Sequence, residues 1–103
     1  MQEKKKKYLR LYLLQEARIN RLQEMCQINP KNRGIYKSEI AEAKTLRIEI
    51  ENKIRLVEDP LLCELLHQKY IFGKTLEEIS LILNYSKRHI ERLHIKALEK
   101  FNM

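Results

Sequence analysis

Apolar residues recur at three- and four-residue spacing along most of the chain, which is the period of an α-helix that buries one face. The longest such stretches run from about Glu3 to Ile28 and from about Ser38 to Glu58. Asn29-Pro30 ends the first stretch, because proline disfavours helix in the residue before it. The polar linker 30–36 is short, so we expect the two long helices to form an antiparallel hairpin or coiled coil.

The second long helix carries a regular seam, with strict three-four spacing at Ile40, Ala43, Arg47, Ile50, Ile54 and Val57. The first helix has a looser seam at Tyr8, Tyr12, Ile19, Leu22 and Cys26. Arg47 either sets register or oligomeric state, or extends its charge to solvent. The seam of the second helix could face the first helix or another chain. Leu46, Ile48 and Leu56 lie off this seam, so we expect a homodimer through the N-terminal helices.

Residues 59–103 are predicted to hold three shorter helices. Asp59 caps the first of them, with Pro60 at the first helical position, where proline is favoured. Gly73 marks its end. With 2 glycines, 2 prolines, no tryptophan and 34 % charged residues, the composition is also that of a helical protein. The predicted fold class is all-α, with a helical hairpin in residues 1–58 and a second unit in residues 59–103.

The stretch 75–101 predicts two helices joined by a tight turn, the pattern of a helix-turn-helix. Thr75 and Glu78 have the spacing of a capping box at the start of the first helix. Asn84 and Tyr85 interrupt the pattern, and Ser86 caps the second helix. The second helix then places four apolar residues on its inward face: Ile90, Leu93, Ala97 and Phe101.

The outward face of this last helix is basic near its N-terminus, where DNA-reading helices meet base edges. Arg88 and Arg92 are the expected guanine readers, since a guanidinium fork matches the O6 and N7 acceptors. Lys87 is expected to hold a phosphate. The alternative is an ordinary solvated helix face. The candidate DNA-binding residues are Thr75, Ser86, Lys87, Arg88, Glu91, Arg92 and Lys96.

The chain has a formal net charge of +7, which favours anionic partners. Residues 86–103 hold five basic and two acidic side chains, a modest footprint for DNA. Because affinity grows with the number of phosphates neutralised, a monomer would bind weakly, and a dimer or a larger machine is expected to help. Lys4 to Lys7 form either a basic arm that follows phosphates, the solvated start of the first helix or a disordered tail.

The C-terminal part resembles the C-terminal DNA-binding region of bacterial sigma factors. The shared positions are the run 73–79 (GKTLEEI), Ser86, Ile90 and the run Lys96, Ala97, Leu98. With Asp59-Pro60 before them, the chain is similar to phage and prophage transcriptional regulators of the ArpU and RinA type. The resemblance implies a sequence-specific, sigma-like DNA-binding regulator of phage or prophage genes, with helix 86–101 in the major groove and RNA polymerase as a further partner.

Two other functions stay open. The chain could be a DNA-packaging oligomer similar to small terminase subunits, or an interaction module that binds RNA polymerase or a sigma factor without reading DNA. An enzyme is not expected, because no nucleophile has a base at interpretable spacing and no phosphate-binding glycine loop is present. Neither a metal nor a cofactor is expected, and Cys26 and Cys63 are interpreted as buried apolar residues. No apolar run approaches 18 residues, so we expect a cytoplasmic protein that avoids membranes.

Overall fold

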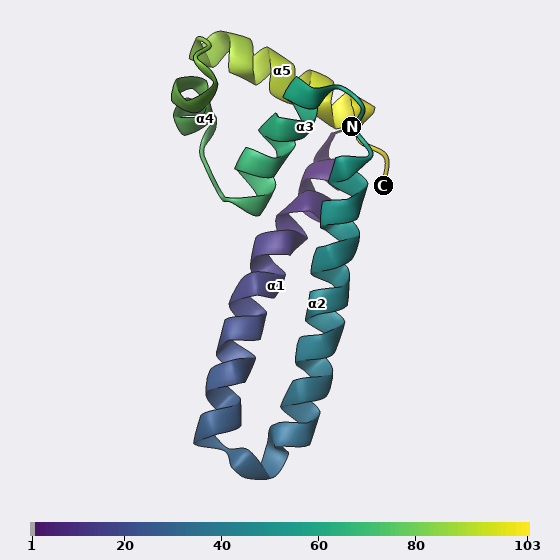
Figure 1. Cartoon of the computed structure of the whole chain (residues 1–103), viewed down its shortest axis with the longest axis vertical. Coiled ribbons are helices and arrows are strands. Elements are labelled where there is room, and N and C mark those ends of the chain that lie inside the picture. Colours follow the sequence, from purple (N-terminus) through teal and green to yellow (C-terminus); the bar gives the residue numbers. More distant parts are fainter. Residues whose placement is uncertain (1) are drawn as a thin grey trace.

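The computed structural model describes residues 2–103, and in this range the chain is helical and contains no strand (Figure 1). The all-α fold class is therefore confirmed. The helices are α1 (Glu3–Ile28), α2 (Arg33–Arg55), α3 (Pro60–Leu66), α4 (Leu76–Leu83) and α5 (Lys87–Lys100). A 3₁₀ turn, η1 (Pro30–Asn32), precedes α2, and a π-helical turn, η2 (His67–Ile71), extends α3.

The helices α1 and α2 form an antiparallel hairpin, and their connection is shorter than predicted (Figure 1). α2 begins at Arg33, so the predicted linker 30–36 is too long and the predicted helix start at Ser38, which we expected to cap the helix, is wrong. Gly34 lies inside the helix, where a glycine costs only about 1 kcal/mol relative to alanine and does not end a helix. The helix also stops at Arg55 instead of Glu58, although Val57 stays buried beyond its end.

The seam of α2 faces α1 of the same chain. Ala43, Ile50 and Ile54 are buried on α2, and the side chains that meet the hairpin interior from α1 are Leu9, Tyr12, Ile19 and Leu22. Arg47 also contacts α1, since its guanidinium lies 3.7 Å from the Glu16 carboxylate and 5.9 Å from the centre of the Tyr12 ring. Of the off-seam residues, Leu46 packs against the core, whereas Ile48 and Leu56 are exposed.

One buried cluster joins the hairpin to the C-terminal helices. It contains Leu9, Tyr12, Ile50, Ile54, Val57, Leu62, Leu66, Tyr70, Ala97, Leu98 and Phe101. Phe101 lies just after α5 instead of within it, but it is fully buried and its ring centre is 6.2 Å from that of Tyr8. The hairpin and residues 59–103 therefore share a core, and α5 is held against the start of α1.

The lysine run at the start of the chain, Lys4 to Lys7, belongs to the first turns of α1. Lys5 Nζ donates a hydrogen bond of 2.8 Å to the Leu98 carbonyl at the C-terminal end of α5, which also accepts one from the Phe101 amide. Cys26 and Cys63 are half-buried instead of fully buried. In the range 2–103, no helix combines the length and the apolar character needed to span a lipid bilayer.

Candidate nucleic-acid interface

The start of α4 is fixed by a capping box. Thr75 Oγ1 accepts a hydrogen bond from the Glu78 amide at 3.1 Å, and the Glu78 carboxylate accepts one from the Thr75 amide at 2.9 Å. The hydrogen bond that the Glu78 carboxylate accepts from the Thr75 amide lowers the pKa of Glu78, because it stabilises the charged form. The predicted box is confirmed, and it places Thr75 at the N-terminus of α4.

The turn from α4 to α5 depends on one left-handed residue and one cap. Asn84 has a φ of 61°, a conformation that asparagine tolerates better than most residues, and it ends α4. Ser86 then accepts a hydrogen bond from the His89 amide at 3.2 Å, which confirms it as the cap of α5. The basic residues that follow therefore begin the first turn of the helix.

The inner faces of α4 and α5 pack on α3 through a small buried cluster. Each helix contributes one fully buried side chain: Leu65, Ile79 and Ile90. Leu76, Leu83 and Leu93 surround them. Because this cluster fixes which side of α5 is buried, the opposite side of the helix is left on the surface.

A buried polar pair also holds α5 in place. A hydrogen bond of 2.8 Å joins the Tyr70 hydroxyl in η2 to His94 Nε2 in α5. Burial lowers the pKa of His94 to about 4, with smaller contributions from the positive charges of Lys69, Lys6 and Arg10. Burial likewise raises the pKa of Tyr70 to about 12. His94 therefore has a structural role as a neutral hydrogen-bonding group.

The outer face of α5 lies at one end of the molecule, away from the turn between α1 and α2 (Figure 1). Besides Lys87 at the start of the helix, four candidate residues are exposed on α5: Arg88, Glu91, Arg92 and Lys96. Arg88 and Arg92 are one helical turn apart, so their side chains are neighbours on the helix surface. Neither arginine has an ion-pair partner among residues 2–103.

Ile95 belongs to the same face and was missed by the sequence analysis. It is 53 % exposed and follows Arg92 by three residues, so it continues the row of Arg88 and Arg92 along α5. The sequence does contain a sign of it, because Ile95 is an apolar residue that does not share the spacing of the buried residues of the helix.

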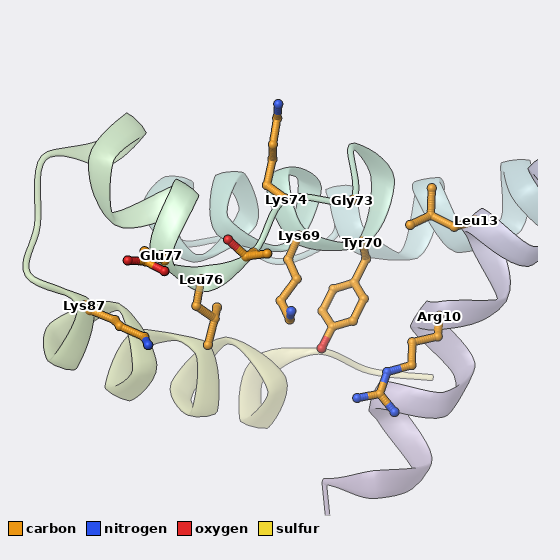
Figure 2. A pocket seen from close by; sticks show the side chains of 10 residues that line it. Arg10, Leu13, Lys69, Tyr70, Gly73, Lys74, Leu76, Glu77 and Lys87 are labelled. Atoms are coloured by element: carbon orange, nitrogen blue, oxygen red, sulfur yellow. The ribbon is translucent and has the colours of Figure 1, made fainter.

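The three other candidate residues lie apart from this row. Ser86 is in the turn, and Thr75 and Lys87 line an open groove of about 510 Å³ beside α4 and α5 (Figure 2). The other lining residues are Arg10, Leu13, Lys69, Tyr70, Gly73, Lys74, Leu76 and Glu77. Arg10 and Lys69 could not be predicted as neighbours, because they are distant in sequence and meet only in the folded chain.

Within residues 2–103, no group of three or more histidine, cysteine, aspartate or glutamate side chains is arranged to hold a metal ion. Comparison of the chain with protein-family models, with curated proteins and with solved structures gives no match. A function is therefore inferred from the arrangement of side chains and from the resemblance to sigma-like regulators.

Proposed function

We propose that this protein is a sequence-specific DNA-binding regulator of transcription that acts on phage or prophage genes in the cytoplasm. It binds duplex DNA and catalyses no reaction. The observation that carries the proposal is the exposed row of Arg88, Arg92 and Ile95 on α5, a helix whose other side packs against the core. The assignment to phage or prophage genes rests on the resemblance to sigma-like regulators.

In the proposed complex, α4, the turn and α5 act as a helix-turn-helix. The major groove of B-DNA is about 12 Å wide and admits one α-helix, which here is α5. Arg88 and Arg92 donate bidentate hydrogen bonds to guanine O6 and N7, and each such pair discriminates against a wrong base by about 1–3 kcal/mol. Ile95 contacts a thymine methyl group, and Glu91 accepts a hydrogen bond from a cytosine amino group.

The remaining candidate residues position the helix without reading sequence. Ser86, Lys87 and Lys96 flank the reading row, so they contact phosphates on the two sides of the groove. α4 crosses the DNA backbone and supports α5 through the Leu65, Ile79 and Ile90 cluster. Thr75 serves this arrangement by fixing the first turn of α4.

The hairpin extends away from the proposed DNA face, in a molecule whose longest dimension is 52 Å (Figure 1). Its seam is covered within the chain, so a homodimer or a contact with RNA polymerase must use residues outside the seam. Ile48 and Leu56 are exposed apolar residues of this kind. We assign the homodimer contact to them, and light scattering of Ile48→Glu tests it, with loss of the dimer as the expected result.

Selection of bound duplexes from a random DNA pool tests the proposed function. At about 150 mM salt, where non-specific attraction is suppressed, the wild-type protein should enrich one motif. Arg88→Ala should lose a base preference in that motif. Arg88→Lys should lose the same preference while keeping the charge, because an ammonium lacks the planar fork. Arg21→Ala removes an exposed arginine far along α1 and serves as the control.

Enrichment of no motif by the wild-type protein would contradict sequence-specific binding. Binding that is weak for every duplex and vanishes as salt rises would have the same meaning. Either result would favour an interaction module that binds RNA polymerase without reading DNA.

A further inference from the structure

The groove beside α5 brings together basic side chains from separate parts of the chain. Arg10 comes from α1, Lys69 from η2 and Lys87 from the first turn of α5. Figure 2 shows Lys87 at one end of the groove and Arg10 at the other, with Lys69 between them. Lys74 also lines the groove, but its side chain points away from the other three (Figure 2). The only acidic lining residue is Glu77, close to Lys87.

These three cations have no counter-ion in the part of the chain that the structure describes. Among residues 2–103, no carboxylate lies within ion-pair distance of Arg10, Lys69 or Lys87. Lys69 is half-buried, and the pKa of its amine is lowered, first by burial and then by the positive charges of Arg10 and Lys6. Like charges held together without a counter-ion repel one another. An anion in the groove would relieve this repulsion.

The groove is continuous with the proposed DNA face. Lys87 is the first residue of α5 and Thr75 caps α4, and both line the groove. A helix in the major groove is flanked by the two phosphate backbones, which present one charge per 3.4 Å of each strand. An open, elongated groove with cations at both ends fits such a strand better than it fits a single small ion.

We propose that Arg10, Lys69 and Lys87 bind successive phosphates of one DNA strand beside the groove that α5 occupies. This inference rests on the proposed function and adds the hairpin to the DNA interface, because Arg10 belongs to α1. Arg10 and Lys69 read no base. They add affinity that is independent of sequence and strongly dependent on salt.

The test measures the affinity of the selected duplex as a function of salt, using fluorescence anisotropy. Each phosphate contact contributes about 0.9 to the slope of log affinity against log salt concentration. Arg10→Gln with Lys69→Gln should therefore lower the steepness of the slope by about 1.8, while the preferred sequence is unchanged. Arg21→Gln with Lys44→Gln removes the same charge from exposed positions farther along the hairpin and should leave the slope unchanged.

Circular dichroism of both double variants confirms that the helices are intact. An unchanged slope in the groove variant, or an equal change in the control variant, would overturn the phosphate contacts and leave the proposed function standing. A changed base preference in the groove variant would overturn the assignment of Arg10 and Lys69 to the backbone. Absence of duplex binding by the wild-type protein would overturn both proposals.

Discussion

The hairpin and the C-terminal helices use charged residues in opposite ways. Every ion pair within residues 2–103 lies in α1 and α2. Two of them cross between the helices, with Arg18 and Glu39 3.8 Å apart and Arg47 and Glu16 3.7 Å apart. The basic residues of 59–103 make no ion pair in the same range. Five of the fourteen basic residues of the hairpin are thus ion-paired within residues 2–103, whereas none of the seven basic residues of 59–103 is.

We interpret this difference as a division of roles, in which the ion-paired residues of the hairpin support its structure and the unpaired basic residues of 59–103 bind a partner. Exposed ion pairs contribute only about 0–1 kcal/mol to stability, so those of the hairpin mainly favour its register. Unpaired cations of like sign contribute nothing favourable to the folded chain, and their mutual repulsion opposes folding. We infer that residues such as Arg88 and Arg92 serve binding and not the fold.

The substitution with the greatest predicted effect lies in the buried cluster that joins the hairpin to the C-terminal helices. Phe101→Ala removes a fully buried ring that packs between α5 and α1, and it should lower the free energy of unfolding by about 3–5 kcal/mol. Phe72→Ala is a matched control, since Phe72 is 63 % exposed and its loss should cost less than about 0.5 kcal/mol. Urea unfolding followed by circular dichroism measures both. Two separate transitions in the wild-type protein would show that the regions do not fold as one unit.

The next prediction compares an unpaired arginine of α5, proposed to read DNA, with an ion-paired arginine of the hairpin. Arg92→Gln should weaken discrimination between DNA sequences by about 1–3 kcal/mol and leave the free energy of unfolding nearly unchanged. Arg47→Gln should do the reverse, with a loss of stability of at most about 1 kcal/mol and no change in DNA binding. Anisotropy titrations and urea unfolding on both variants measure the two quantities. Equal effects of the two substitutions on DNA binding would contradict the division.

Acid should weaken the attachment of α5. Since the pKa of His94 falls from 6.5 to about 4 on folding, the unfolded chain binds more protons between these pH values. The contribution of His94 to stability is therefore complete above pH 6.5 and is lost as the pH falls toward 4. His94→Gln keeps an acceptor for the Tyr70 hydroxyl and does not titrate. Its stability should vary less with pH over this range, and an identical pH dependence would contradict the assignment.

The smallest expected effect concerns the cap of α4. Thr75→Ala removes the acceptor for the Glu78 amide and should cost about 1 kcal/mol of stability, as for other caps. Thr45→Ala is the matched control, because Thr45 is an exposed residue inside α2 and alanine is the better helix former. Urea unfolding compares the two variants. A cost at Thr45 as large as that at Thr75 would argue against a specific capping role.

Features that depend on neighbours in the sequence were predicted correctly. The bounds of α1 and the caps Asp59, Thr75 and Ser86 follow from local backbone chemistry, and the structure shows each cap accepting the amide hydrogen bonds expected of it. The inward residues of α5 follow from helical period in the same way. The helical period also predicted that Arg88 and Arg92 are exposed, and the structure confirms it.

Features that depend on tertiary packing were not predicted. The groove joins Arg10 to Lys69 through contacts between α1 and η2, and nothing near either residue signals the other. The early start of α2 at Arg33 has a different reason, since Gly34 and Ser38 are weak stop and start signals that a long helix overrides. Ile95 was not predicted, because the candidate DNA contacts were chosen among polar and charged residues and Ile95 is apolar.

One comparison decides whether the unpaired cations of α5 bind DNA while the ion-paired arginines of the hairpin do not. It compares two variants of equal net charge on the duplex selected by the wild-type protein: Arg88→Gln with Arg92→Gln, and Arg18→Gln with Arg47→Gln. At about 150 mM salt, we expect the first pair to lower affinity at least about tenfold, the equivalent of 1.4 kcal/mol, and the second to change it less than about twofold. Equal losses would mean that net charge alone attracts DNA, and would contradict the account.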